Sequence, residues 1–371
     1  MLRNHKLIAA KAVVALAAVP CLMWAHEYGP DPGYSGVPRE NPSCISAQCH
    51  VGTANDPANK GSVKVTFGNG TNYVPGVKQH LVVTTDAKQG ALRQIVNDEG
   101  FRDLAVPAGV ASRFSVLTAA GLFPAAVGGV RIEDVLAGAA WMDQRTRSPV
   151  LWENPALLLA AMLYLAETRA STHTVVLMPY SDRLRDLARW FAQLWAESLG
   201  KAVDLDGRKR AVGTTPQAAV GVSDQHSLLQ LWLDGPADRV VCFVRVEDHG
   251  REIEIPSAYG DLEGVGYLRG KGLGALLNME QRATELALQQ RGRLSLTLSV
   301  PELNAFTLGQ LVFLFEAVTV FAASLHRVDS WNQPAAEEGR QLTFGLAGRK
   351  AWEDRDEVEA WLAAKATRPL V

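Results

Sequence analysis

The chain lacks a large net charge of either sign. Its 371 residues include 37 Lys and Arg against 39 Asp and Glu, and no run of basic residues is flanked by aromatic ones. Proteins that bind the phosphate backbone of nucleic acids need a basic surface, so we expect no nucleic-acid partner. The composition is that of a soluble globular protein, and the length favours two domains.

Cysteine is scarce after the first fifty residues. Three of the four cysteines, Cys21, Cys44 and Cys49, lie in that stretch, and only Cys242 follows it. This asymmetry indicates two segments with different redox histories. The spacing Cys44-x4-Cys49-His50 leaves three interpretations open: a small disulfide, covalent haem attachment through a variant of the usual two-residue spacing, or free or metal-binding thiols.

The first 25 residues have the layout of a leader for export. Basic residues between Arg3 and Lys11 precede the apolar run 12–23, and Ala25 is a suitable residue before a cleavage point. We expect a secretory signal peptide at 1–25, with an uncleaved membrane anchor and a buried helix as the alternatives. The apolar run is short for a membrane span, so we expect no stable membrane insertion.

Residues 26–84 predict a small β-rich segment of the exported type. Its first part is dense in Gly, Pro, Asn and Ser, which indicates loops. SVKVTF, the turn GNG and NYVPGVKQHLVVT then predict a β-hairpin. The stretch GYSGVPRENPSCISAQCHVGT together with YVPGVKQHLVVT resembles the reeler-like β modules found in some exported bacterial proteins, and this resemblance covers residues 26–80.

From about residue 85 the pattern changes to strands that alternate with helices. Continuous apolar and β-branched runs predict strands at 173–178, 239–246 and 293–300. Apolar residues at helical spacing predict helices at 184–197, 275–290 and 308–326. Such alternation indicates an α/β domain with a parallel sheet.

Six motifs in this part of the chain resemble those of a known family. They are SRFSVLTAAGLFPAAV (112–127), GAAWMDQ (138–144), MPYSDRLRDLARWFAQLWAESLGK (178–201), TTPQAAVGVSDQHSLLQLWLDGP (214–236), PELNAFTLGQLVFLFE (301–316) and WNQPAAEEGRQLT (331–343). Each resembles its counterpart in the phosphoglucose isomerase family, and the order is the same. The resemblance implies a three-layer sugar-isomerase (SIS-type) α/β domain with a parallel sheet and C-terminal helices. It also implies the interconversion of glucose 6-phosphate and fructose 6-phosphate, without a cofactor or metal.

The reaction that the resemblance implies moves a proton between adjacent carbons through an enediolate, so one base must face both carbons. Glu197 matches the catalytic base of the family, in the ESLGK segment, and Gln193 one helical turn earlier aligns with a substrate-contacting glutamine. Arg113 aligns with the arginine that faces the charge of the enediolate oxygen. Ala111 and Ser112 replace two glycines of the family there, which makes backbone close to the ligand less permissive.

Three further positions follow from the same resemblance. His226 in SDQHS matches the histidine that opens the sugar ring, and in the family this residue reaches the site of the neighbouring subunit, which implies a homodimer. Gln333 matches a substrate-binding glutamine. Arg340 stands where the family has a lysine that assists ring opening, and a guanidinium is a poor proton donor because its pKa lies above ~12.

The two loops that hold the substrate phosphate in the first domain of the family have no counterpart in this sequence. We therefore expect 85–150 to be a remnant that links to a second sugar-isomerase domain at 151–347, followed by a tail helix at 348–371. Loss of phosphate anchoring predicts impaired isomerase activity. The alternatives are a non-catalytic sugar-phosphate-binding or interaction protein, and an exported module in which residues 26–80 carry the function.

The two parts of the chain also predict different compartments. A sugar-phosphate isomerase acts in the cytoplasm, whereas a signal peptide directs a chain to a secreted or periplasmic location. A chimeric or truncated gene and a functional secreted fusion are both compatible with this conflict.

Overall fold

The computed structural model describes residues 82–349 and 355–366. The chain divides into two compact units, Met1–Ala108 and Gly109–Val371. The expected signal peptide, the β-rich segment up to residue 81 and the Cys44-x4-Cys49 spacing lie outside the described residues, and these interpretations stay predictions.

The described part of the first unit is a β–α–β element. Strand β1 (Val82–Asp86) pairs in parallel with β2 (Arg102–Val106), and α2 (Ala91–Glu99) connects them. The chain leaves α2 through Gly100, whose φ of 64° is a left-handed conformation that glycine adopts without strain. β1 begins within the stretch for which the sequence predicts a β-hairpin. β1 pairs in parallel with β2, which is not the antiparallel pairing of a hairpin. The residues predicted to form the first strand of that hairpin lie outside the described residues.

The second unit is built on a four-stranded parallel sheet in the order β6-β3-β7-β8. The strands are β3 (Thr174–Pro179), β6 (Thr215–Ala218), β7 (Arg239–Asp248) and β8 (Leu294–Glu302). The two central strands, β3 and β7, are continuous apolar runs because helices cover both of their faces. A separate antiparallel ribbon joins β4 (Lys201–Val203) to β5 (Lys209–Val212).

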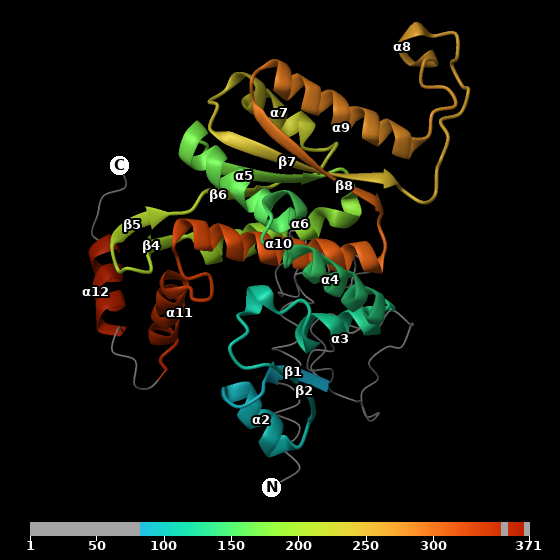
Figure 1. The fold of residues 1–371 in the computed structure, drawn as a ribbon. Helices are drawn as coiled ribbons and strands as arrows, with labels where there is room; N and C mark the ends of the chain where they lie inside the picture. Colours follow the sequence, from blue (N-terminus) through green and yellow to red (C-terminus); the bar gives the residue numbers. More distant parts are fainter. Residues whose placement is uncertain (1–81, 350–354, 367–371) are drawn as a thin grey trace, which may run out of the picture. The chain divides into compact units, whose positions relative to one another are not determined.

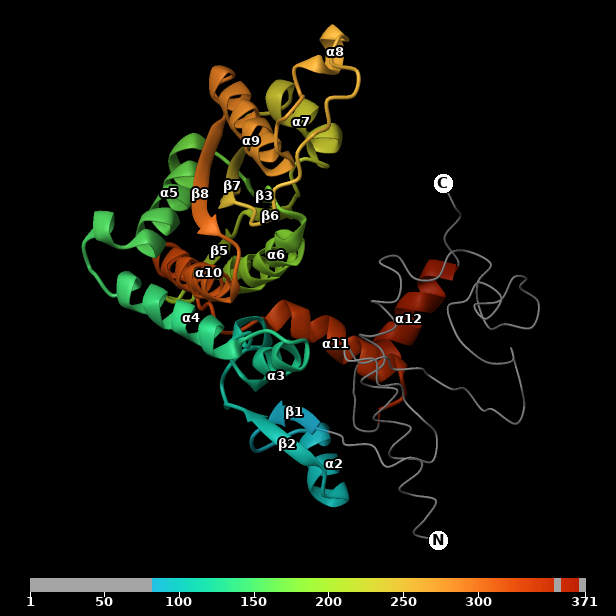
Figure 2. The ribbon, with the colours of Figure 1, turned by 90° about the vertical axis from the view of Figure 1, so that its right-hand side faces the viewer.

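Helices on both faces of this sheet complete three layers (Figures 1 and 2). They are α5 (Pro155–Ala170), α6 (Arg185–Leu199), α7 (Gln225–Asp234), α9 (Leu273–Gln290) and α10 (Ala305–His326). Val175 and Leu177 of β3 point into the core formed with α5, α6 and α10, whereas Val176 and Met178 point into the core formed with α7 and α9. Because successive side chains of a strand point to opposite faces, β3 contributes to two separate apolar cores.

A further helix, α4 (Ile132–Thr146), crosses α10 at very close range because each helix has a glycine at the crossing. A Cβ on Gly138 would lie 1.9 Å from the carbonyl oxygen of Phe306, and a Cβ on Gly309 would lie 1.9 Å from that of Val135. Helix α10 is long and apolar enough to cross a membrane, but half of its most apolar stretch is buried inside the protein. Such burial is typical of the core helix of a globular domain.

The predicted α/β fold class with a parallel sheet and C-terminal helices is confirmed. The three predicted strands correspond to β3, β7 and β8, and the three predicted helices to α6, α9 and α10. β6, β4 and β5 were not predicted, because strands of three or four residues carry too little periodic pattern. The remaining elements are η1 (Ser112–Phe114), α3 (Ala119–Val127), η2 (Leu151–Glu153), η3 (Asp182–Leu184), α8 (Glu263–Gly266), α11 (Pro334–Leu346) and α12 (Arg355–Ala366).

Candidate active site

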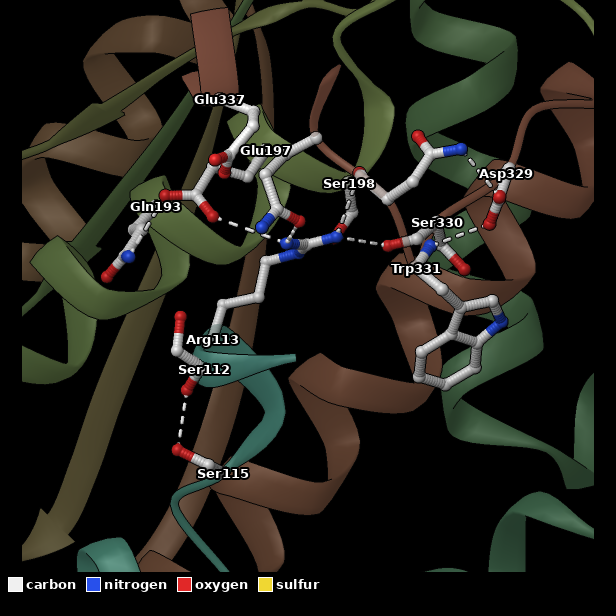
Figure 3. A network of polar contacts seen from close by, with 12 residues as sticks. Ser112, Arg113, Ser115, Gln193, Glu197, Ser198, Asp329, Ser330, Trp331 and Glu337 are labelled. Atoms are coloured by element: carbon white, nitrogen blue, oxygen red, sulfur yellow. Dashed lines mark hydrogen bonds and ion pairs between the residues drawn. The ribbon is translucent and has the colours of Figure 1, made fainter. Parts of the chain in front are cut away.

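Three segments that are far apart in the sequence meet at one end of α6. They are η1, the last turn of α6, and the residues 329–333 that lead into α11 (Figure 3). The indole nitrogen of Trp190 donates a hydrogen bond of 3.0 Å to the carbonyl oxygen of Arg113, which fastens η1 to α6. The rings of Phe114 and Trp331 lie 4.8 Å apart and join η1 to the third segment.

The guanidinium of Arg113 lies at the centre of this junction and is 1% exposed. Figure 3 shows it with Glu197 on one side and Ser330 on the other. Its five N–H groups all donate within the protein. The acceptors are Ser198 Oγ at 2.8 Å, Gln333 Oε1 at 2.6 Å, Glu197 Oε2 at 3.3 Å, the Ser330 carbonyl at 2.6 Å and the Asn332 carbonyl at 3.2 Å. Arg113, which belongs to η1, thus binds the two other segments at once.

The environment of Arg113 has two opposing effects on its pKa. Burial lowers the pKa of Arg113, and the carboxylate of Glu197 raises it. A guanidinium remains charged in either case, because its pKa starts far above neutrality. Since every N–H is engaged, a direct contact between Arg113 and a substrate oxygen requires one existing bond to be exchanged. The longest of the five, to Glu197, is the most readily replaced.

Glu197 lies in the last turn of α6, with both carboxylate oxygens held. Oε1 accepts from the side-chain amide of Gln193 at 3.0 Å, and Oε2 accepts from Arg113. Gln193 is one turn earlier on the same helix face, as the sequence predicts. The Glu197 side chain is 29% exposed, so it is oriented by the protein and still accessible to a ligand. A carboxylate with these properties can act as a general base.

Gln333 is the residue from which α11 starts, and its position depends on a turn made by the preceding residues. Asp329 Oδ1 accepts from the backbone N–H of Trp331 at 2.8 Å, and its Oδ2 accepts from the Asn332 amide at 2.7 Å. The turn presents the side-chain oxygen of Gln333 to Arg113. The structure therefore brings together four residues that the sequence singles out: Arg113, Gln193, Glu197 and Gln333.

The other two predicted site residues lie outside this network. His226 is exposed in the first turn of α7, and no hydrogen bond joins its side chain to the network. Arg340 is exposed on α11 and forms an ion pair of 2.6 Å with Glu337, one turn earlier. An ion pair at the surface contributes little to stability.

Two residues of the junction were not among the predicted site residues. Ser198 is completely buried and accepts the Nε–H of Arg113. Lys201 is 8% exposed, and its Nζ donates to the carbonyl oxygens of Glu197 at 2.6 Å and Ser198 at 3.0 Å. Burial lowers the pKa of Lys201, and the nearby charge of Arg113 lowers it further. Both residues belong to the ESLGK segment, and their place beside Glu197 in this motif is the sequence feature that could have pointed to them.

Comparison with known proteins agrees with the resemblance seen in the motifs. The sequence model of phosphoglucose isomerase matches residues 51–356. The chain is 44% identical over 277 residues to the glucose-6-phosphate isomerase of Rubrobacter xylanophilus, and 40% identical over 281 residues to that of Carboxydothermus hydrogenoformans. These alignments include 75% and 76% of this chain but 62% and 60% of the relatives, so the chain spans about three fifths of their length.

Two solved structures have the same fold. A hypothetical protein from Thermus thermophilus superposes with a TM-score of 0.67 at 39% identity, over 71% of this chain and 62% of that one. A glucose-6-phosphate isomerase from Chlamydia trachomatis superposes with a TM-score of 0.63 at 19% identity, over 76% of this chain and 62% of that one. The family match begins at residue 51, so it includes part of the segment that the sequence predicts to be an exported β module. With more than half of its residues matched in this way, the chain belongs to the phosphoglucose isomerase family.

Proposed function

We propose that the chain is a glucose-6-phosphate isomerase in which Glu197 carries a proton between C1 and C2 of the open-chain sugar phosphate. The observation that carries the proposal is the carboxylate of Glu197, which is accessible at the surface and held on both oxygens by Gln193 and Arg113. The relatives of 44% and 40% identity that bear this name support the choice of substrate.

In the proposed reaction, Glu197 removes the proton from C2 of the aldose while the carbonyl at C1 gains electron density. The resulting cis-enediolate spans C1 and C2. The same carboxyl group then returns the proton to C1, and a hydroxyl proton moves so that the carbonyl forms at C2. No atom is gained or lost, and one base serves both carbons because they are adjacent.

The proposal assigns supporting tasks to the neighbouring residues. Gln193 and Arg113 keep the Glu197 carboxylate in one orientation, which lowers the cost of reaching the transition state. Gln333 faces the same space and is proposed to contact the sugar. Exchange of the 3.3 Å bond between Arg113 and Glu197 would free one N–H for the enediolate oxygen.

We further propose that the enzyme is a homodimer and that His226 acts in the site of the partner subunit. What supports this is the exposed position of His226, without a hydrogen bond to the Glu197 network of its own chain. Ring opening needs a group that exchanges protons near neutral pH, and an imidazole meets that requirement. A cytoplasmic location fits this substrate, while the signal-like first 25 residues favour export.

Turnover by the 371-residue chain is proposed to be slower than that of the relatives that it matches. The sequence contains neither phosphate-binding loop of the family's first domain, and remote phosphate contacts position the reacting carbons. A second candidate function is sugar-phosphate binding without turnover. It is favoured by the complete engagement of Arg113 and by Arg340 at the position of the ring-opening lysine.

The test is incorporation of solvent deuterium into a carbon-bound position of fructose 6-phosphate in D2O, followed by NMR. This assay reports proton abstraction even when net turnover is slow. We expect Glu197→Gln to lower the exchange rate by about 10³-fold, because amide oxygen is not a base. Glu133→Gln, an exposed change on α4, serves as the matched control and keeps the rate.

The outcomes separate the two candidate functions. Exchange by the wild-type chain that disappears in Glu197→Gln supports the isomerase. Saturable binding of fructose 6-phosphate with no exchange in the wild-type chain supports the binding protein and overturns the catalytic proposal.

A further inference from the structure

The lysine at the end of α6 occupies an unusual position for its residue type. Lys201 is 8% exposed, whereas lysine is among the residues that are almost never fully buried. Its ammonium donates to two successive carbonyl oxygens, those of Glu197 at 2.6 Å and Ser198 at 3.0 Å. Lys201 thus binds the backbone of Glu197 and Ser198, the same two residues whose side chains accept hydrogen bonds from Arg113.

The end of a helix needs such a partner, because the last carbonyl groups have no N–H ahead of them in the helix. The aligned peptide dipoles also place partial negative charge at the carboxyl end of a helix. A carboxylate at that end, such as Glu197, is therefore in an unfavourable position. The ammonium of Lys201 satisfies two of the free carbonyls and brings a compensating positive charge to the same place.

Lys201 is anchored from outside the helix. It follows Gly200, at which α6 ends, and it is the first residue of β4, where it pairs with Val212 of β5. The ribbon β4–β5 therefore fixes the backbone from which the lysine side chain returns to α6. A shift of α6 relative to this ribbon would break the contacts to Glu197 and Ser198.

The charged groups that act on the ammonium come from three other elements. Arg113 on η1 repels it, whereas Asp329, after α10, and Glu197 attract it. The balance of two cations and two carboxylates leaves the junction close to neutral. Removal of Lys201 would leave Glu197 and Asp329 opposed by the single charge of Arg113.

We propose that Lys201 is a positioning residue that fixes the last turn of α6, and with it the Glu197 carboxylate, in the geometry required for proton transfer. The proposal rests on the proposed role of Glu197 as the base. It differs from the role of Arg340, which stands at the family's lysine position on α11. Lys201 touches no substrate atom and acts through Glu197 and Ser198.

The kinetic test uses the full chain with Lys201→Met, which keeps an unbranched side chain, one atom shorter, and removes its charge. We expect kcat for deuterium exchange to fall by about 10²-fold with KM changed by less than about twofold, since the base is misplaced while the sugar contacts remain. Lys201→Arg restores a cation and is expected to recover part of the rate. Lys209→Met, an exposed change in the paired strand β5, is the control and keeps the wild-type values.

A second measurement does not depend on activity. The Nε–H of Arg113 donates to Ser198, so its ¹⁵N-detected NMR signal should exchange slowly with solvent in the wild-type chain. We expect at least about tenfold faster exchange in Lys201→Met and no change in Lys209→Met, because only the first frees the end of α6. Unchanged kcat together with an unchanged Arg113 signal in Lys201→Met would overturn the proposal.

The remaining outcomes are also decisive. A wild-type chain without deuterium exchange refutes the proposed function, and the Arg113 signal then still tests the positioning role. If Lys201→Met does not fold, the ammonium signal of Lys201 is measured in the wild-type chain. Slow exchange and restricted motion of that ammonium support the proposal, and rapid exchange of a mobile ammonium overturns it.

Discussion

Two regions of the second unit each bury an ionisable side chain, but only one of them supplies it with hydrogen-bond partners. At the end of α6, Arg113 makes five hydrogen bonds, two to α6 and three to residues 329–333. In the middle of α10, Glu316 has a buried carboxyl oxygen, Oε1, without a hydrogen-bond partner among the described residues. Burial raises the pKa of Glu316 to about 8, so near neutral pH the group is mostly uncharged.

The difference lies in what each region offers the buried group. The junction around Arg113 supplies carbonyl, hydroxyl and carboxylate oxygens from loops and a helix end, where backbone groups are free. The middle of α10 lies among apolar side chains, and its backbone groups already bond within the helix. A buried charge persists where partners are available, and a proton neutralises it where they are not.

A second contrast lies within the predicted site itself. Arg113 and Glu197 belong to a buried network, whereas His226 and Arg340 are exposed. We expect changes in the network to affect both stability and activity, and changes at the exposed positions to affect activity alone.

The largest expected effect comes from Arg113→Met. This change removes the donor to Ser198, Gln333, two backbone carbonyls and Glu197 Oε2, and we expect a loss of about 3–5 kcal/mol in the free energy of unfolding. Chemical denaturation followed by tryptophan fluorescence measures it. Arg131→Met, in which the lost ion pair with Asp134 is exposed, is the control. Equal midpoints for the two variants would show that the network does not hold the three segments together.

Glu316 is expected to make the free energy of unfolding depend on pH. Its pKa is about 8 in the folded chain against 4.5 for an ordinary glutamate, so the folded state retains a proton that the unfolded state loses between these values. The stability from this group is therefore complete below about pH 4.5 and is lost as the pH rises through 8. The slope is at most about 1.4 kcal/mol per pH unit.

Glu316→Gln removes the titrating group and should flatten this dependence. We expect the variant to be more stable than the wild type at pH 9 and similar to it at pH 5, as measured by urea unfolding at both values. Glu133→Gln is the exposed control and should retain the wild-type slope. Parallel stability curves for wild type and Glu316→Gln would contradict a neutral, buried carboxyl.

The proposed role of His226 in the site of the partner subunit is tested by mixing two inactive chains. If His226 acts in the partner's site, a dimer of one Glu197→Gln chain and one His226→Gln chain contains one intact site. Random exchange of subunits makes half of the dimers mixed, so we expect about a quarter of the wild-type activity. The deuterium-exchange assay measures it. Mixed dimers without activity would place both residues in the site of one chain.

The smallest expected effect on stability comes from Arg340→Lys. A lysine can donate a proton to the ring oxygen, whereas a guanidinium cannot, so we expect about a tenfold faster reaction from the closed-ring sugar. Stability should not change measurably, because Arg340 is exposed and its ion pair with Glu337, one turn earlier, lies at the surface. Stopped-flow measurement of ring opening reports the rate, with Arg340→Met as the control that lacks a donor. Equal rates for the lysine and methionine variants would exclude this position from proton transfer.

Much of the fold of the second unit follows from local sequence pattern. The continuous apolar runs of β3, β7 and β8 and the helical spacing in α6 and α9 were sufficient to predict an α/β domain with a parallel sheet. The short strand β6 and the ribbon β4–β5 carry no such pattern, because a strand of four residues or fewer has too few side chains to show a period.

The candidate site could be predicted only in part. The spacing of Gln193 and Glu197 is local, because residues four apart share one face of a helix. The motifs named Arg113 and Gln333 by resemblance, but no local pattern distinguishes a buried arginine from one at the surface. Lys201 was not singled out for the same reason: its role depends on the end of α6 and on the pairing of β4 with β5.

The sequence by itself determined the family, the alternation of strands and helices, and the helical face that carries Gln193 and Glu197. Only the tertiary structure decided that Arg113 is buried with all five N–H groups in hydrogen bonds, and that Lys201 donates to the carbonyl oxygens at the end of α6. The physical reason is distance along the chain. Arg113 is 84 residues from Glu197 and 220 from Gln333, so their contacts depend on the packing of helices and sheet and not on any local pattern.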